Sequence, residues 1–332
     1  MRPVAERAGV SPATVSRVLN GHDNVREDYR ARVLQAVAEL DYRPNRLARN
    51  LRRQRADMIG VVVSDIENPH FSESVRAVED AAYRHGYRVL LCNTDETPDK
   101  QRAYLQMLAQ ERVLGVILSP SDPASDEIAE LLDLGIPVVA LDRQVTDERA
   151  DTVVADNVAA ARIATEHLVA AGHRRVGLIA GSPGVETGSE RLQGYTSGMR
   201  AAGLEPMVAS GRFRMEEGRT ATHELLADES PPTALVAGNN LTAVGALQAL
   251  REAGLAVPRE VGLVAVDDPF WAELTDPPLT TVAQPVRAMA HKAMSFLLER
   301  IEGRRAGSRR EVFPVELRQR RSCGVPRAER RA

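Results

Sequence analysis

The sequence predicts a two-part protein, in which a small helical head precedes a larger α/β body with parallel sheets. Three observations support this prediction. Residues 1–56 carry twelve arginines against six acidic residues, a formal charge of +6, and because the whole chain of 332 residues carries −3, the remainder carries −9. Two short helical patterns meet at a Gly-Val-Ser corner near the N-terminus. Beyond residue 57, short β-branched runs alternate with helical patterns, as in βαβ units.

Composition indicates a globular protein of the cytoplasm. The chain is 43% hydrophobic, which is enough to fill real cores over two or three domains. Its two cysteines, Cys92 and Cys323, fit neither a metal-binding spacing nor a disulfide framework. The N-terminus lacks the apolar region of a signal peptide, and no long apolar run occurs, so we expect no export and no membrane span.

The charge of the head favours a nucleic-acid partner. Arginines that neutralise phosphates release counterions, which gives affinity for any duplex. An ordinary solvated charged face is the alternative interpretation of such a basic stretch.

The head has the pattern of a helix-turn-helix. A short helix over residues 4–8 ends at Gly9, and Ser11 followed by Pro12 starts a second helix, because serine is a favoured N-cap and proline suits the first helical position. A third helix over residues 27–40 closes a small three-helix core. The second helix turns Val15, Val18 and Leu19 inward and Pro12, Ala13, Ser16 and Arg17 outward. We expect this outward face to enter the major groove, with Arg17 as the main base or phosphate contact.

The string AGVSPATVSRVLN at 8–20, followed by LDYRPN at 40–45 and LARNLR at 47–52, resembles the lactose/galactose/purine repressor family. The resemblance implies a helix-turn-helix head over 1–43 and a hinge helix with linker over 44–56, whose Leu51 wedges into the minor groove of the operator. An exposed leucine amid arginines suits such a role, and an ordinary amphipathic linker helix is the alternative. The DNA-contacting residues that it implies are Ser11, Pro12, Ala13, Thr14, Ser16, Arg17, Asn20, Asn45, Ala48, Leu51 and Arg52.

Three positions depart from the family's usual pattern. Arg26 and Tyr29 replace the serine and threonine usual at the start of the third helix, which removes a cap, and Asp41 stands where glycine is common. The operator sequence therefore cannot be carried over from the family.

The body shows the alternation of a parallel α/β protein. Helical patterns over 73–85 and 158–171 each end at a glycine, as helix C-termini prefer. The predicted strands are 58–64, 87–93, 115–119, 137–141, 176–180, 234–237 and 261–266.

The resemblance extends over the body through the motifs at 65–71, 156–157, 171–175 and 278–282. It implies a two-lobed, periplasmic-binding-protein-like fold, with one lobe from 57–157 plus 285–312 and the other from 158–284 plus 313–332. The chain would cross between the lobes near 156–157, near 284–285 and within 312–317. It further implies a homodimer that represses transcription from a near-palindromic operator, and an effector in the cleft whose binding changes lobe orientation and thereby the hinge helices.

The candidate effector site consists of polar and aromatic residues that follow the predicted strands, because open α/β sheets bind ligands beyond the carboxyl ends of their strands. The resemblance favours Arg143, Arg191 and Asp267 most. Carboxylates, amides and arginines can pair with neighbouring hydroxyls while Phe71 and Trp271 cover a ring face, so a sugar or polyol is expected, with nucleobases and other metabolites as alternatives. Each charged residue could instead form a structural ion pair, and Trp271 could belong to a core. The candidates are Asp65, His70, Phe71, Ser119, Arg143, Asp156, Arg191, Asn240, Asp267, Trp271 and Gln284.

No catalytic, metal or cofactor motif is evident. The GSPG segment at 181–184 follows a strand but lacks dinucleotide-binding spacing, and His173 at a helix-to-strand turn is interpreted as structural. We therefore expect neither an enzyme nor a cofactor, and interpret the arginine-rich end, 318–331, as a solvated edge. A cytoplasmic sugar-binding protein without DNA function is the remaining alternative, which the head opposes.

Overall fold

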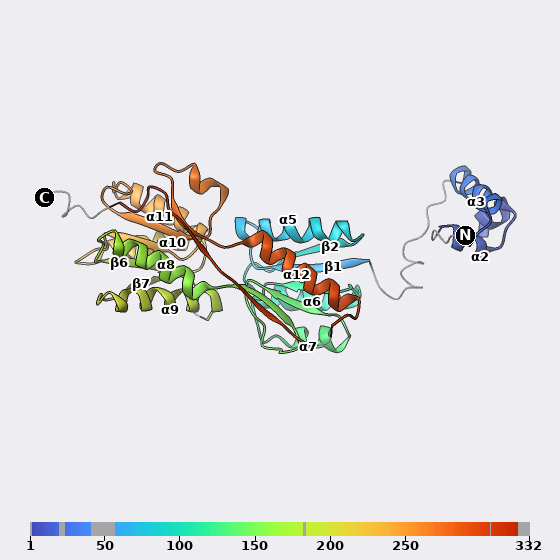
Figure 1. Cartoon of the computed structure of the whole chain (residues 1–332), viewed down its shortest axis with the longest axis horizontal. Coiled ribbons are helices and arrows are strands. Elements are labelled where there is room, and N and C mark those ends of the chain that lie inside the picture. The colour runs from blue at the N-terminus through green and yellow to red at the C-terminus, as the bar shows by residue number, and fades with distance from the viewer. Residues whose placement is uncertain (1, 20–23, 41–56, 182–183, 306, 325–332) are drawn as a thin grey trace. The chain divides into compact units, whose positions relative to one another are not determined.

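The computed structural model describes residues 2–19, 24–40, 57–181, 184–305 and 307–324. The chain divides into two compact units, Met1–Ala56 and Asp57–Ala332 (Figure 1). The predicted hinge over 44–56 lies outside the described residues. The finer boundaries expected within each unit stay a prediction.

Over residues 2–19 and 24–40, the first unit holds three short helices around a small apolar core. They are α1 (Arg2–Ala8), α2 (Pro12–Leu19) and α3 (Glu27–Glu39). Gly9 has φ +63°, which permits the tight corner between α1 and α2. The Ser11 hydroxyl accepts a hydrogen bond from the backbone N–H of Thr14 (3.1 Å), as an N-cap does. Val15 and Val33 are buried together in the core.

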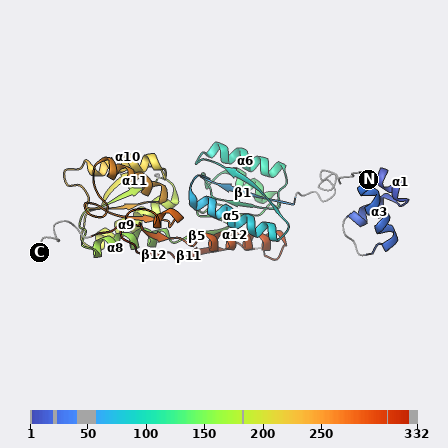
Figure 2. The same ribbon diagram turned by 90° about the horizontal axis from the view of Figure 1, so that it is seen from above.

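The first lobe of the second unit is built on a six-stranded sheet in which all strands are parallel. Helices α5 (Pro69–Arg84) and α12 (Val286–Ile301) cover one face, and α6 (Pro98–Gln110) and α7 (Asp126–Asp133) cover the other (Figures 1 and 2). The strand order is β11 (Arg310–Phe313), β5 (Asp151–Ala155), β4 (Val138–Leu141), β3 (Val116–Leu118), β1 (Met58–Val63) and β2 (Arg88–Asn93).

The second lobe repeats this architecture. Helices α8 (Asn157–Ala170) and α9 (Glu186–Ala201) pack on one face of its sheet, and α10 (Met215–Leu226) and α11 (Asn240–Glu252) on the other. The strand order is β12 (Glu316–Arg318), β10 (Thr280–Ala283), β9 (Gly262–Val266), β8 (Ala234–Ala237), β6 (Val176–Ala180) and β7 (Met207–Ser210). A short 3₁₀ helix, η1 (Phe270–Glu273), follows β9 along the chain. The other strands pair in parallel, but β12 is antiparallel to β10.

The chain passes between the lobes three times: between β5 and α8, between β10 and α12, and between β11 and β12. The loops after the parallel strands of both sheets therefore face one another across the gap between the lobes. This arrangement places the polar residues that follow the strands on the two sides of one cleft.

Several predicted elements differ from the observed ones. The helix expected from residue 73 begins a turn earlier, at Pro69, because the Asn68 side chain caps it by accepting from the backbone N–H of His70 (2.9 Å). Strands β5, β7, β10, β11 and β12 were not among the predicted strands. In the parts that the structure describes, we find no helix with the length and apolar character of a membrane span.

Candidate functional site

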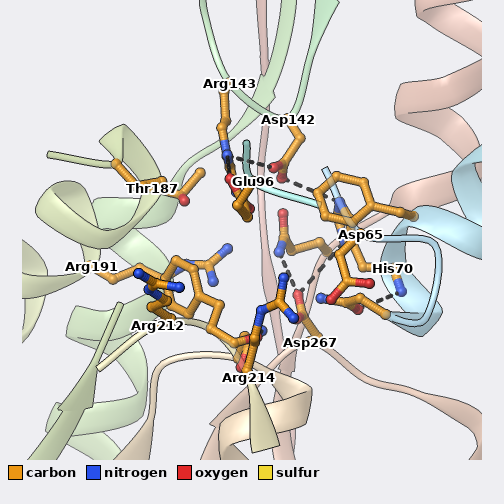
Figure 3. A pocket seen from close by; sticks show the side chains of 16 residues that line it. Asp65, His70, Glu96, Asp142, Arg143, Thr187, Arg191, Arg212, Arg214 and Asp267 are labelled. Carbon is orange, nitrogen blue, oxygen red and sulfur yellow. Dashed lines mark hydrogen bonds and ion pairs between the residues drawn. The ribbon is translucent and has the colours of Figure 1, made fainter. Parts of the chain in front are cut away.

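A pocket lies between the two lobes at the carboxyl ends of both sheets (Figure 3). It contains about 550 Å³ of space, part of it open to solvent. The first lobe contributes Asp65, Asn68, His70, Phe71, Glu96, Asp142 and Arg143, the second Val185, Thr187, Arg191, Arg212, Phe213, Arg214, Asn239 and Asp267, and the second crossing Gln284.

Arg143 is fixed against the wall of the first lobe. It follows β4 closely, and its guanidinium donates two hydrogen bonds to the Glu96 carboxylate, at 2.8 and 2.6 Å, and one to the carbonyl of Pro120 at 3.2 Å. Such a two-point pair orients the planar guanidinium, so its remaining edge has a defined direction.

His70 and Asp142 form a buried pair beside Arg143. His70 stands in the first turn of α5, and its Nε2 lies 3.2 Å from Asp142 Oδ1. Burial alone would raise the pKa of Asp142, but the charge and hydrogen bond of His70, with the charges of Arg143 and Arg191, lower it to about 2. Asp142 is therefore an anion in the neutral pH range.

Arg191 and Phe213 form the wall of the second lobe. Arg191 donates to Asn157 Oδ1 (2.9 Å) and to the Gly238 carbonyl (2.7 Å), and its guanidinium carbon lies 5.3 Å from the centre of the Phe213 ring. A Cβ at Gly181 would stand 2.1 Å from the Phe213 ring. Glycine is therefore required at this strand end for the ring to reach its place beside Arg191.

Asp267 follows β9 and is held by polar side chains. Its Oδ1 accepts from Gln284 Nε2 (2.5 Å), and its Oδ2 accepts from the backbone and side-chain nitrogens of Asn240 (3.3 and 3.1 Å). The same Asn240 amide donates to Asn68 Oδ1 in the first lobe (2.8 Å). This chain of hydrogen bonds links the two lobes at one end of the pocket.

Two further contacts join the lobes. Arg214 donates to the Asp95 carboxylate at 2.5 Å, and the Glu186 carboxylate accepts from the backbone N–H of Gln144 at 2.9 Å. Arg214 and Asp95 are partly exposed, so their pair is at the rim of the cleft.

Among the described residues, the buried side-chain atoms without a hydrogen-bond partner all belong to residues at this interlobe site. They are His70 Nδ1, Arg143 Nε, Asn240 Oδ1 and Gln284 Oε1. Buried polar groups are normally paired because an unpaired one costs about 1–3 kcal/mol. Arg143 Nε can only donate a hydrogen bond, and the two amide oxygens can only accept one. A ligand that pairs all three atoms must therefore offer both acceptors and donors.

The structure brings most of the predicted effector residues together. Asp65, His70, Phe71, Arg143, Arg191, Asp267 and Gln284 line the pocket, and Asn240 adjoins it through Asp267 and lines a smaller neighbouring cavity.

Three other predicted candidates line neither the pocket nor the smaller cavity beside it. The Asp156 carboxylate caps α8 by accepting from the backbone N–H of Ala159 (2.8 Å). Trp271 packs against the outer core of the second lobe, and Ser119 is buried beside Ser64.

Several lining residues were missed from the sequence. Asp142 directly follows an apolar run and was detectable by the rule that selected Arg143. Phe213, Arg212 and Arg214 belong to a segment without a clear strand or helix pattern, so no local signal identified them. Glu96 lies three residues beyond the end of β2, so it does not directly follow a predicted strand.

His173 has a structural environment. It is 1% exposed, its Nδ1 lies 3.0 Å from the Thr233 hydroxyl, and its Nε2 lies 2.9 Å from the carbonyl of Cys323. These contacts tie the second lobe's core to its C-terminal segment. Within the described ranges, no group of three or more His, Cys, Asp or Glu side chains could hold a metal ion.

The candidate DNA surface is the outer face of α2. Ser11, Pro12, Ala13 and Arg17 are exposed, and Thr14 and Ser16 are half-buried, whereas Val15 and Val18 are buried. The other implied contacts, Asn20, Asn45, Ala48, Leu51 and Arg52, lie outside the described residues.

The start of α3 adds a basic feature to the head. Arg26 stands at the N-cap position without a side-chain cap, and the guanidinium carbons of Arg26 and Arg32 lie 4.8 and 4.9 Å from the centre of the Tyr29 ring. The lost cap expected from the sequence is therefore accompanied by two arginines stacked on one aromatic ring.

A helix-turn-helix unit followed by a two-lobed ligand-binding unit defines an effector-controlled DNA-binding regulator. Comparison with known families agrees: residues 1–45 match "Bacterial regulatory proteins, lacI family", and residues 56–321 match "Periplasmic binding proteins and sugar binding domain of LacI family". The chain belongs to the LacI family.

Individual relatives extend over nearly the whole chain. The HTH-type transcriptional repressor PurR of Pectobacterium carotovorum is 36% identical, covering 98% of this chain and 97% of its own. The ribose operon repressor of Halalkalibacterium halodurans is 38% identical, covering 96% and 95%. The lac repressor dimer bound to operator and the anti-inducer ONPF superposes with a TM-score of 0.85 at 29% identity, covering 97% and 98%.

The chain is therefore a DNA-binding transcriptional regulator of the cytoplasm, controlled by a small effector, and not an enzyme. The alternative of a sugar-binding protein without DNA function is excluded, because the head itself matches the family's DNA-binding region.

Proposed function

We propose that the protein is a homodimeric repressor whose effector is a neutral, polyhydroxylated molecule of monosaccharide size, bound between the lobes. The unpaired buried atoms at the pocket and at the smaller cavity beside it carry this proposal. Arg143 Nε needs an acceptor, whereas Asn240 Oδ1 and Gln284 Oε1 need donors. A hydroxyl group supplies both functions, and several hydroxyls on adjacent carbons can meet several such atoms at once.

The charges of the pocket support a neutral ligand. Arg143 is paired with Glu96, Arg214 with Asp95, and His70 lies between Asp142 and Asp267. A ligand with its own net charge would have to compete with these pairs. A polyol would instead accept from the arginines and donate to the carboxylates that already face the cleft.

Aromatic rings on both sides favour a ring-shaped ligand. Phe71 of the first lobe and Phe213 of the second both line the pocket. A nucleobase is the second candidate, because two aromatic rings could also cover a flat heterocycle and because one relative is named PurR.

The binding test is a thermal-shift panel of D-ribose, D-glucose, hypoxanthine and D-ribose 5-phosphate, since a ligand of the native state raises its apparent stability. We expect a neutral sugar to raise the melting temperature, and Arg191→Met to abolish the rise. Arg162→Ala, which removes an exposed pair with Glu166 on α8, is the matched control and should retain it. A rise with hypoxanthine alone would replace the sugar by a nucleobase, and a rise with the phosphate alone would refute a neutral ligand.

For the head, we propose that Ser11, Pro12, Ala13, Thr14, Ser16 and Arg17 contact one half of a near-palindromic operator. Asn20, Asn45, Ala48, Leu51 and Arg52 are proposed to complete the contact, with Leu51 in the minor groove.

The DNA test begins with selection of duplexes from a random pool by the full chain. We expect a two-fold symmetric consensus and steeply salt-dependent binding. Leu51→Ala should weaken the selected duplex far more than a scrambled one, and equal weakening of both would rule out the wedge. Effector and operator should change each other's affinity by the same factor.

A further inference from the structure

His70 contacts a carboxylate in each lobe. Its Nε2 lies 3.2 Å from Asp142 Oδ1 in its own lobe, and its Nδ1 lies 3.8 Å from Asp267 Oδ1 in the other lobe. All three side chains are buried, with exposed fractions of 6 to 8%. Two anions buried together are costly unless a cation stands between them.

We propose that His70 is a proton-dependent latch between the lobes: its imidazolium joins Asp142 to Asp267, so closure of the cleft takes up a proton. The proposal concerns a second ligand of the cleft, the proton, and does not require the effector to be a sugar.

The other charged groups near His70 have partners of their own. Arg143 pairs with Glu96, and on the side of the smaller cavity Glu73 pairs with Arg287 at 2.9 Å and Asp268 with Arg320 at 2.8 Å. Arg191 is the cation that opposes protonation of the imidazole. Asp142 and Asp267 thus remain as the anions that face His70 directly.

The position of the proton also follows from hydrogen bonding. Nε2 faces the Asp142 carboxylate, an acceptor, and so carries one proton of the ring. Within the described part of the chain Nδ1 has no hydrogen-bond partner, and it lies 3.8 Å from Asp267 Oδ1. A second proton on Nδ1 would face the opposite lobe, and it is this proton that separation of the lobes would release.

The sign of the linkage follows. Burial lowers the pKa of His70, but the charge and hydrogen bond of Asp142 and the charge of Asp267 outweigh it and raise the pKa above its ordinary value. Opening of the cleft removes the contribution of Asp267 to the raised pKa of His70, because Asp267 belongs to the other lobe. The closed form therefore binds the proton more tightly, and the latch is complete at low pH and lost as pH rises through the raised pKa.

The first experiment is an NMR titration of the histidine ring signals of the full chain without effector, with His70→Asn identifying the His70 signal. We expect the His70 pKa to lie above 6.5 in the parent chain and to be lower in Asp267→Asn than in the parent. An unchanged pKa in Asp267→Asn would overturn the latch, because Asp142 alone would then hold the proton.

The second experiment measures lobe separation directly. Spin labels on Arg84→Cys and Glu224→Cys report the two lobes, and the native Cys92 and Cys323 are buried. We expect the separation to increase between about pH 6 and pH 9 in the parent chain and to be independent of pH in His70→Asn. His70→Gln serves as a second neutral variant if His70→Asn melts early. A pH response that persists in the neutral variant, or none in the parent, would refute the proposal, whereas a failed sugar panel would leave both results standing.

Discussion

Asp142 and Asp267 occupy equivalent positions in the two lobes. Each directly follows the third strand of its sheet, counted from the edge strand nearest the C-terminus, and each has a left-handed backbone, with φ +72° and +74°. Aspartate tolerates this region better than most residues, whereas β-branched residues do not. The two lobes thus place a carboxylate on either side of His70 by the same local device.

Asp267→Asn should change the free energy of unfolding only slightly but weaken effector binding strongly. Asparagine also tolerates the left-handed region, so the backbone is kept, while the charge facing the cleft is lost. Asp267→Val should be less stable than Asp267→Asn by about 1–3 kcal/mol because valine is strained there. Urea unfolding of both variants checks this, and equal stability would show that the backbone relaxes without cost.

The rim pair of Arg214 and Asp95 should act on the cleft rather than on folding. Because both side chains are partly exposed, Arg214→Ala should hardly change the melting temperature. It should speed effector release, measured by stopped flow with the ligand that the thermal-shift panel identifies. Arg219→Ala is the matched control, since its partners Glu216 and Glu252 lie in the same lobe. An equal effect of both variants would contradict a role in closure.

Asp151 should contribute to the acid sensitivity of the first lobe. Its carboxylate is fully buried and contacts Arg300 at 3.0 Å and Arg309 at 3.1 Å. Burial raises its pKa, but hydrogen bonds and charge from the two arginines lower it below the ordinary value. The stability it provides is therefore present above the unfolded pKa, about 3.9, and is lost as pH falls through the lower folded value.

Asp151→Asn should accordingly be destabilised at neutral pH by about 3–5 kcal/mol, because two cations lose their partner. The difference in the free energy of unfolding between Asp151→Asn and the parent chain, measured by urea titration, should become smaller below about pH 4. A difference that stays constant with pH would contradict this assignment.

Gly194 should resist substitution because α9 crosses α8 closely there. A Cβ at Gly194 would stand 2.0 Å from the carbonyl oxygen of Val158. Gly194→Ala should therefore lower stability by about 1–3 kcal/mol through forced separation of the helices. Gly307→Ala is the control, since among the described residues beyond its chain neighbours no heavy atom lies within 4 Å of its added Cβ. Thermal melting of the two variants tests this prediction. Similar melting temperatures would show that α8 and α9 accommodate the added methyl group without loss of stability.

The sequence was informative where one strand or helix buries a continuous apolar run. Strands β1, β6 and β8 were predicted to within a residue or two for this reason. The edge strands β11 and β12, REVF and ELR, are half-exposed and charged, so they lack a recognisable pattern. Strand β11 pairs with β5, whose residues lie more than 150 positions earlier in the sequence, and β12 pairs with β10.

The residues of the site likewise divide into those that the sequence could identify and those that it could not. Residues that lie within two positions of a strand end, such as Asp65 and Asp267, could be selected from the sequence. Phe213 could not, because its place depends on the absence of side chains at Gly181 and Gly238, which are distant in sequence. Trp271 was expected at the ligand for its ring, but apolar neighbours in the second lobe hold it.

The first lobe is completed by β11, which pairs with β5 along residues 310–313. On the ribosome, this lobe must wait for nearly the entire polypeptide before its last strand emerges, although most of its sheet is synthesised within the first half. The three-helix head needs no such delay, since all its helices come from the first 40 residues. A chain terminated shortly before residue 310 would thus retain a DNA-reading head on an unfinished body.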